Sequence, residues 1–381
     1  MITPQPFIYL AGKKIASFTL LGSLGLFLSL CTTLLLTYFL DLSIQVWLGL
    51  ALIGIIVFFG LAEIMNRIKG TPVLVYYHHE LAVVLLSSGF LLFTKSGHIL
   101  SYLDIVATGL GIVLTFGRIG CFMAGCCHGK PASFGIHYHK EHAEMGFPYY
   151  YLHTRLFPVQ LLEAFGVTFI VIFMLIVIQL KFAPGTAFGI YILGYGLLRF
   201  LLEFARGDIA RPYYGPLSEA QWFSVVFAIL LLVISLAGGF PGFFWHVAVI
   251  TLILAVFAFL LLSGKFSKPW MKIKHYQIRK LAILINELNV ECNKDVRLKI
   301  GKNTILITAG ILEEEDMTVK HFTVSMYPLA KAEWLDFIGN LIYSLQNHSG
   351  VLTKLNQSTT MRHFIIKSQK NIPAPKAIHD F

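Results

Sequence analysis

Residues 159–181 read VQLLEAFGVTFIVIFMLIVIQLK, a run in which Glu163 and the final Lys181 are the only charged residues. A helix of about 20 mostly apolar residues is long enough to cross the hydrocarbon core of a bilayer. We therefore predict a membrane span here. Seven further runs of similar character lie at 16–39, 45–65, 74–94, 103–123, 185–204, 219–237 and 242–263. The run at 74–94 is the weakest, because it begins with ionisable residues.

The composition of the whole chain excludes an ordinary water-soluble protein. Of its 381 residues, 56% are hydrophobic and only 13% are charged, whereas soluble domains are about 25% charged. No small-residue cleavage site follows the first apolar run, so we expect that run to be retained as a span. The net charge of +10 fits Lys and Arg that meet anionic headgroups, and we predict no nucleic-acid partner.

Beyond residue 263 the sequence becomes polar. We predict helices and strands there, which together make a small soluble α+β domain of unknown role at 264–381. The helices are expected at 275–289 and 330–346, and the strands at 296–308, 318–326 and 362–368. The predicted fold class is therefore an all-α polytopic membrane protein, with seven or eight transmembrane helices in a domain at 1–263, followed by that soluble domain. The basic stretch Lys265–Lys274 joins the two, and a disordered tail is expected from about Asn371.

The end of the 103–123 run carries an arginine inside the motif Gly117-Arg118-Ile119-Gly120. A guanidinium in an apolar span costs several kcal/mol unless it is paired or wet. One interpretation is that Arg118 grips a phosphate, since the planar guanidinium matches a phosphodiester and the glycines allow a headgroup or another backbone to approach. The other is an arginine at a helix end whose head reaches the interface.

A second group of polar residues follows helical spacing. Tyr195, Arg199, Glu203 and Arg206 stand at i, i+4, i+8 and i+11, which places them on one helix face. Ionisable residues inside a membrane normally face the protein interior and pair with one another. An Arg199–Glu203 pair that only fixes helix packing is the simpler alternative, but the stripe is longer than such a pair requires.

Two further segments add ionisable residues to apolar runs. Gln160 and Glu163 share a helix face at the start of the 159–181 span, and a buried glutamate there requires an arginine partner, for which Arg118 or Arg199 is the candidate. In Tyr77-His78-His79-Glu80, a neutral histidine would be able to accept a proton. Adjacent histidines point to different helix faces, so we predict no metal shared between them.

Three of the five cysteines, Cys121, Cys126 and Cys127, lie within seven residues, followed by His128. The spacing does not match the usual paired ligands of a zinc site, and we predict no metal. Cys121 is interpreted first as a small buried residue. A disulfide from Cys121 to Cys126 or Cys127, a metal site and a reactive thiol remain the alternatives.

These elements occur together, and in the same order, in the prolipoprotein diacylglyceryl transferase family, which the chain resembles over about residues 10–237. The shared elements are Gly117-Arg118-Ile119-Gly120-x-Phe122 with Gly125 and Gly129, Pro158-x-Gln160-Leu161-x-Glu163, Tyr195-Gly196-x-x-Arg199-Phe200-x-x-Glu203-Phe204-x-Arg206, and Leu217-Ser218-x-x-Gln221-x-x-Ser224. Each element alone is moderately specific, whereas four in order are strong support for the resemblance.

The resemblance implies a function in lipoprotein biosynthesis. Such an enzyme moves the diacylglyceryl group of phosphatidylglycerol onto the lipobox cysteine of a prolipoprotein, releases glycerol 1-phosphate and uses no cofactor. By the match, Arg118 and Arg199 clamp the phosphate, and Glu203 orients Arg199 or shapes the headgroup site. His79 stands near the family's base. The remaining substrate-binding residues implied are Gly117, Gly120, Gln160, Glu163, Tyr195 and Arg206. The expected partners are phosphatidylglycerol, the lipobox substrate and membrane lipid.

Several positions depart from the family pattern, and they keep two other functions open. Cys121 replaces an asparagine, Cys126 an acidic residue and Phe157 a histidine, Phe18-Thr19 replaces Tyr-Gly, and Glu80-Leu81 replaces the Gly-Gly after the histidine. One alternative is a lipid-binding membrane protein that does not catalyse transfer. The other is a thiol or metal protein built on the cysteine cluster, in which replacing those cysteines abolishes function while Arg199→Gln is tolerated.

The expected location is the bacterial plasma (inner) membrane, which the chain crosses several times. Lys and Arg gather on the face that contains the 124–158 loop, and the positive-inside rule would make that face cytoplasmic. The family has its motif face outside the cytoplasm instead. We follow the family, because arginines that belong to a site say nothing about topology.

Overall fold

The computed structural model describes residues 4–10, 12–69, 76–147, 151, 155–207, 213–214, 217–241, 244–262, 281, 285, 295–300, 303–313, 317–327, 335, 338–339, 341–343, 350–356 and 361–369. These residues form two compact units. The first, called the helical unit, comprises Pro4–Lys130 and Pro158–Phe259. The second contains β3, α5 and the strands β6 to β10.

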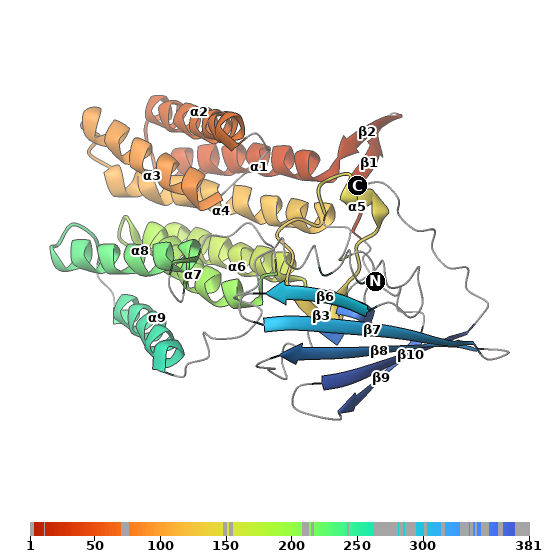
Figure 1. Cartoon of the computed structure of the whole chain (residues 1–381). Helices are drawn as coiled ribbons and strands as arrows, with labels where there is room; N and C mark the ends of the chain where they lie inside the picture. Colours follow the sequence, from red (N-terminus) through yellow and green to blue (C-terminus); the bar gives the residue numbers. More distant parts are fainter. Residues whose placement is uncertain are drawn as a thin grey trace. The chain divides into compact units, whose positions relative to one another are not determined.

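Within the described residues, a helix occupies every predicted span (Figure 1). The helices are α1 (Ser17–Phe39), α2 (Ile44–Lys69), α3 (Tyr76–Phe93), α4 (Ile99–Ala124), α6 (Val159–Gln179), α7 (Thr186–Leu202), α8 (Glu219–Leu236) and α9 (Phe244–Leu262). Six of them, α1, α2, α4, α6, α7 and α8, are long and apolar enough to cross a membrane. The predicted class, a polytopic membrane protein followed by an α+β region, is confirmed.

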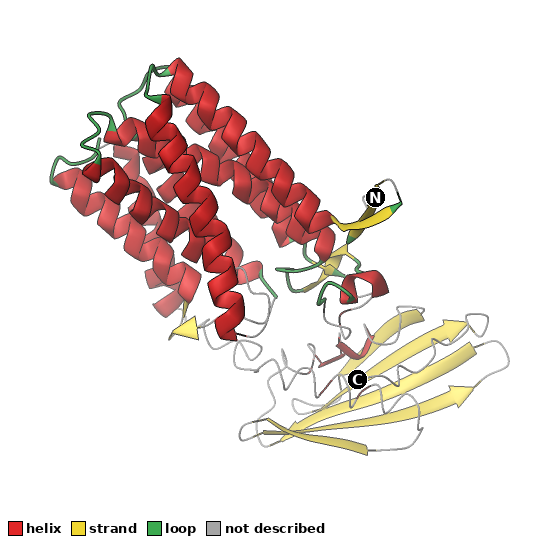
Figure 2. Cartoon of the chain, turned by 90° about the horizontal axis from the view of Figure 1, so that it is seen from above, coloured by secondary structure: helices red, strands yellow, loops and turns green. Residues whose placement is uncertain are grey.

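The helices of the helical unit run side by side, and α4 packs against α1, α3, α6 and α7 (Figures 1 and 2). The contact between α1 and α4 uses small residues, as is usual where lipid rather than water surrounds the helices. Ser29 donates a hydrogen bond to the carbonyl oxygen of Gly109 over 3.0 Å. A side chain at Gly109 would meet the hydroxyl of Ser29 at 2.9 Å. This close approach therefore requires glycine.

The outward face of α1 is the apolar one. The buried residues of α1 are Ser17, Gly25, Ser29, Thr33 and Thr37. By contrast, Phe27 is 62% and Leu35 is 68% exposed. In a water-soluble protein the large apolar residues would be buried and the small polar residues exposed. Because the exposed side chains are large and apolar over the length of a span, α1 faces lipid on this side.

Several short strands and one 3-10 turn lie at one end of the helical unit, next to the helices that carry the polar motifs. A hairpin of β1 (Phe7–Leu10) and β2 (Lys13–Ala16) leads into α1. The 3-10 turn η2 (Glu203–Ala205) follows α7. Before α8, β4 (Tyr213–Tyr214) pairs with β5 (Leu217–Ser218). At the opposite end, Asp104 caps α7. Its two carboxylate oxygens each accept a backbone N–H at 2.7 Å, from Gly185 and Phe188.

The second unit is built on an antiparallel sheet with the strand order β6-β7-β8-β10-β9. The strands are β6 (Asp295–Ile300), β7 (Asn303–Glu313), β8 (Met317–Tyr327), β9 (Gly350–Asn356) and β10 (Met361–Gln369). Alternate residues of one face, such as Ile305, Phe322 and Phe364, are buried with Leu281 and Ile338, which are helical. The polar loop between α4 and α6 also contributes β3 (Pro131–Ile136) and α5 (Lys140–Ala143) to this unit.

Two predictions for this unit need correction. The single strand expected at 296–308 is two strands, because Ile300 pairs with Asn303 and the chain reverses between them. Strand β9 was not predicted, since its sequence is short and polar. The described residues within 275–289 and 330–346 are helical, as expected. The basic stretch Lys265–Lys274 and the predicted tail from Asn371 lie outside the described residues. The domain boundary at residue 264 stays a prediction.

Candidate active site

The predicted arginines and glutamates meet at one end of the helical unit. Arg118 comes from the last turns of α4, and Glu163 from the first turns of α6. Arg199 comes from the end of α7, and Glu203 from the 3-10 turn η2 that follows it. Successive helices run in opposite directions, so the end of α4, the start of α6 and the end of α7 come together. The four side chains are between 1% and 8% exposed. They therefore form a buried charged network rather than a set of surface residues.

Glu163 lies at the centre of this network. Its Oε2 atom is 3.1 Å from Nε of Arg118 and 3.8 Å from Nη1 of Arg199. Its Oε1 atom accepts a hydrogen bond from the hydroxyl of Tyr195 at 3.2 Å. On the other side, Nη2 of Arg199 is 2.9 Å from Oε2 of Glu203. The prediction that Glu163 pairs with Arg118 or Arg199 is thus met by both arginines.

The two arginine nitrogens that face Oε2 of Glu163 are close to its charge but are not well aligned for a hydrogen bond. Nε of Arg118 and Nη1 of Arg199 are buried, and neither makes a hydrogen bond of acceptable geometry to the described part of the chain. Buried polar groups are nearly always hydrogen-bonded. Such donors are suited to an anionic oxygen, which a guanidinium binds through parallel N–H groups.

The loop after α4 is tied to the segment after α7. Gly207 donates its N–H to the carbonyl of His128 at 2.9 Å, and Lys130 donates its own to the carbonyl of Ala205 at 3.0 Å. The Lys130 ammonium also bonds the carbonyl of Phe204. Arg206 is only 4% exposed, and its positive charge repels that of Arg118. Gly129 also forms a β-bridge with Arg206, 77 residues later in the chain, so the two motifs are joined into one structure.

Gln160 and the two glycines have distinct places. The Gln160 side chain donates to the carbonyl of Cys126 at 2.8 Å, so it supports the loop after α4. Gly120 contacts α1, because a side chain there would meet the Cα atom of Phe18 at 3.2 Å. Beside Gly117 no described atom lies within 4 Å of where a Cβ would stand. Of the two predicted glycines, Gly117 is the one with open space next to it.

His79 lies on α3 and is fully buried, with its ring 5.1 Å from that of Phe58. The next residue, Glu80, points elsewhere and interacts electrostatically with Arg118 and Glu163. His78 is partly exposed, and its Nε2 atom lies 3.1 Å from Oε1 of Glu219. Three ionisable side chains at the start of α3 therefore have three different surroundings.

Several residues that support the network were given no role in the sequence analysis. Glu80 is one of them. The sequence feature that could have identified it is a carboxylate inside an apolar run. Gln221 is another: its side chain donates to the carbonyl of Phe200 at 3.1 Å and accepts the N–H of Ser218 at 3.0 Å. The hydroxyl of Ser218 accepts the N–H of Gln221 in return, a capping box that starts α8. The sequence feature that could have identified this capping box is a serine followed three residues later by glutamine.

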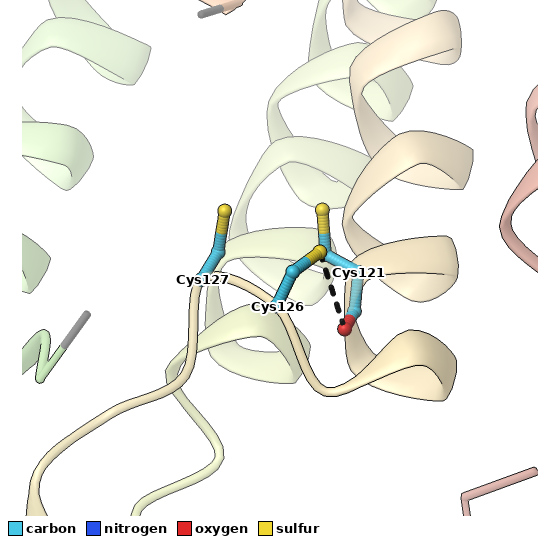
Figure 3. Close-up of side chains that lie close together, drawn as sticks. All are labelled: Cys121, Cys126 and Cys127. Carbon is cyan, nitrogen blue, oxygen red and sulfur yellow. Dashed lines mark hydrogen bonds between the residues drawn. The ribbon is translucent and has the colours of Figure 1, made fainter. Parts of the chain in front are cut away.

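The three clustered cysteines lie beside the arginines. Their Sγ atoms are all within 4.8 Å of one another, with Cys121 on α4 and Cys126 and Cys127 on the loop that follows (Figure 3). Hydrogen bonds from Cys121 and Cys126, and then the charges of Arg206 and Arg118, hold the pKa of the Cys127 thiol well below its usual range. Burial opposes this shift. The thiols are all free in the described structure.

Residues 74–237 match the model of the prolipoprotein diacylglyceryl transferase family. A phosphatidylglycerol–prolipoprotein diacylglyceryl transferase of Clostridium tetani is 32% identical over 137 residues, which are 36% of this chain and 53% of that protein. Enzymes named in the same way from Clostridium perfringens and Chlorobaculum tepidum are also 32% identical, over 135 and 123 residues.

The comparisons cover the part of the chain that holds the site. The chain spans about half the length of the first two relatives, 53% and 50%, and 40% of the third. The matched residues include α4, α6, α7 and the turn η2, which carry the buried network, and α8, which supports it. The resemblance is therefore confirmed over residues 74–237, where the chain is similar to the prolipoprotein diacylglyceryl transferase family.

Proposed function

We propose that this protein transfers the diacylglyceryl group of phosphatidylglycerol to the lipobox cysteine thiol of prolipoproteins, in the bacterial plasma (inner) membrane. The names of its relatives supply the reaction and the two substrates. The observation that carries the proposal for this chain is the buried pair Arg118 and Arg199, which share Glu163 through ion pairs that are not well-aligned hydrogen bonds.

The reaction makes two demands on the site. The phosphate must be held and its developing negative charge stabilised as the bond from the glyceryl carbon to oxygen breaks. The incoming sulfur must be a thiolate, because the thiol is a poor nucleophile. The new bond joins sulfur to the glyceryl carbon, and the electrons of the broken bond leave with glycerol phosphate.

Arg118 and Arg199 are placed to meet the first demand. A guanidinium in a water-poor site interacts with a phosphate far more strongly than at the surface. Glu163 and Glu203 keep both arginines in position, and Tyr195 in turn orients Glu163. We assign Gly117 to the approach of the headgroup, because space is open beside it. We assign a supporting role around the two phosphate-binding arginines to Gly120, Gln160 and Arg206.

The second demand was expected to fall on His79. That role stays a prediction; the His79 ring is buried and lies against the ring of Phe58. The absence of a nucleic-acid partner also stays a prediction. A lipid-binding protein without transferase activity is the competing function, and the replaced accessory positions around Cys121 and Cys126 favour it.

The test uses the full chain in liposomes that contain phosphatidylglycerol, with a lipobox peptide as acceptor. Transfer is followed by the mass gain of the peptide and by release of glycerol phosphate. Arg118→Ala and Arg199→Ala should each lose at least about 100-fold in rate, as for removal of a charge-stabilising group. The matched control is Arg67→Ala, because Arg67 also pairs with a glutamate four residues away but is 79% exposed.

The two functions predict different results in this assay. Transfer by wild type and by Arg67→Ala, with loss in both buried variants, supports the enzyme. Folded wild-type protein that binds phosphatidylglycerol and transfers nothing at any lipid concentration would refute transfer and favour the lipid-binding protein.

A further inference from the structure

The cysteine cluster is a group of reactive side chains that the proposed function does not use. We propose that Cys121, Cys126 and Cys127 bind one thiophilic divalent cation, of which zinc is the type, and that the acceptor thiol occupies the fourth position on that cation. The second half of this proposal rests on the proposed function, whereas the first half does not.

The separation of the three sulfur atoms suits a single ion. Zinc–sulfur bonds are about 2.3 Å long, so sulfurs on one tetrahedral ion stand about 3.8 Å apart. The three Sγ atoms already lie within 4.8 Å of one another. Closing this difference of about 1 Å requires only small rotations of the side chains. Three protein donors leave one tetrahedral position for another ligand, as in catalytic rather than structural zinc sites.

Adjacent cysteines normally point away from each other and cannot bind the same ion, but the backbone conformation here allows Cys126 and Cys127 to do so. Residues next to each other in a helix or strand point to different sides. Here Gly125 has φ 82°, and Cys127 has φ 55°, a left-handed conformation that is uncommon for a residue with a side chain. The chain turns so that the sulfurs of Cys121 and Cys127 point the same way, with the Cys126 sulfur beside Cys121 (Figure 3).

The surroundings favour a cation bound by three thiolates. A divalent cation with three thiolates has a net charge of −1, and of −2 once hydroxide or the acceptor thiolate fills the fourth position, so it needs positive charge nearby in a buried setting. Arg118 and Arg206 both interact electrostatically with Cys127. Cys121 is buried, but Cys126 and Cys127 are only partly buried, so an ion can reach the cluster from outside.

The position beside Arg118 gives the ion a task in the transfer. A cation that holds hydroxide in its fourth position exchanges it for the acceptor thiol, and the thiol proton leaves as part of the water formed. The bound thiolate sulfur then attacks the glyceryl carbon, and the carbon–oxygen bond breaks toward phosphate. No histidine base is required. The metal supplies the thiolate and the arginines hold the leaving phosphate.

The first experiment measures metal binding with neither lipid substrate nor peptide present. The full chain is purified in detergent with a reductant, stripped with a chelator and titrated with Zn²⁺ or Co²⁺. We expect one ion per chain by elemental mass spectrometry. With Co²⁺ we expect thiolate-to-cobalt charge-transfer absorption and the visible bands of a tetrahedral site. Thiol titration confirms that the cysteines are reduced.

Variants assign the ligands. Cys121→Ser, Cys126→Ser and Cys127→Ser should each lower the affinity for the ion at least about tenfold, and the triple variant should lose the cobalt bands. Cys31→Ser is the matched control, because Cys31 is an exposed free thiol on α1 and should leave the spectrum unchanged. Fully reduced wild-type protein without cobalt absorption, or a triple variant that binds as wild type does, would overturn the site.

The second experiment tests the fourth position. Adding the lipobox peptide to the cobalt-loaded protein should increase the thiolate-to-cobalt absorption, while the same peptide with serine for cysteine should not. In the transfer assay the triple variant should lose about 100-fold in rate. If the triple variant transfers at the wild-type rate, the ion has no part in the reaction. If the wild type itself transfers nothing, the proposed function fails together with the role of the acceptor thiol, while the cobalt titration still decides the metal site.

Discussion

Glu163→Gln is the substitution whose cost follows most directly from the geometry of the site. Glu163 is 1% exposed and lies 3.1 Å from one arginine and 3.8 Å from another. At an effective dielectric constant of about 20, charges at these separations attract by about 5 and 4 kcal/mol before the cost of burial is subtracted. Glutamine keeps the shape and removes the charge. Measured losses for breaking such buried pairs are about 3–5 kcal/mol.

The expected result is a large fall in the thermal midpoint of the purified protein. For a unit of about 200 residues, 1 kcal/mol corresponds to about 2–4 °C, so Glu163→Gln should lower the midpoint by about 6–20 °C. The control is Glu63→Gln. Glu63 and Arg67 are closer together, at 2.8 Å, but 59% and 79% exposed, and such pairs contribute less than about 1 kcal/mol.

Two results would refute this reasoning. Equal midpoints for Glu163→Gln and Glu63→Gln would mean that the network is not buried. The second concerns lipid. Without Glu163, the arginines lack their shared anion, so phosphatidylglycerol should raise the midpoint of Glu163→Gln more than that of the wild type. If phosphatidylcholine has the same effect, the arginines do not recognise the anionic headgroup.

Three further predictions concern other parts of the chain. Asp104→Asn removes the negative charge that caps the N-terminal end of α7, which should cost about 1–2 kcal/mol in thermal unfolding and leave transfer by the folded fraction unchanged, since Asp104 lies at the opposite end of the bundle. His79→Asn should slow transfer less than about tenfold if a metal provides the thiolate, and about 100-fold or more if His79 is the base, as steady-state rates will show. Burial and then the neighbouring His363 lower the pKa of His321 below 6.5, so its protonation opposes folding. Stability at this site is therefore complete above about pH 6.5 and falls as the pH drops below it. Pulse proteolysis of the C-terminal strands at pH 7.5 and 5.5 should show this loss, and His363→Asn should reduce it. An unchanged pH dependence in His363→Asn would contradict the assignment.

The helices could be predicted from the sequence because the bilayer imposes a simple rule. Each span must satisfy its own backbone and be about 20 apolar residues long. The predicted runs accordingly agree with the helices within a few residues, including α3, whose polar start made it the weakest. The strand pairing of the C-terminal sheet was harder. The reversal between β6 and β7 and the short strand β9 depend on partners far along the chain.

Part of the site was also within reach of the sequence. Helical spacing indicated that Tyr195, Arg199 and Glu203 share a face, and the cost of a buried charge required a partner for Glu163. The sequence left open which arginine that partner was. The structure brings both to it, because α4 and α7 end where α6 begins.

The environment of each ionisable residue was decided only by tertiary contacts. His78, His79 and Glu80 are consecutive in the sequence, yet one pairs with Glu219, one is buried against Phe58 and one interacts with Tyr191 and Arg118. Each successive residue is rotated around the α3 axis, so its surroundings depend on which neighbouring helix lies on that side. Periodicity alone contains no such information.

What the sequence determined by itself was therefore the membrane class of the protein, the positions of its helices and the identity of its charged motifs, because hydropathy and helical spacing are local properties. The tertiary structure alone decided that one glutamate serves two arginines and that three cysteine sulfurs lie within 4.8 Å of one another. Both depend on how the chain packs and turns in three dimensions: the first on residues far apart in the sequence, and the second on left-handed turns at Gly125 and Cys127.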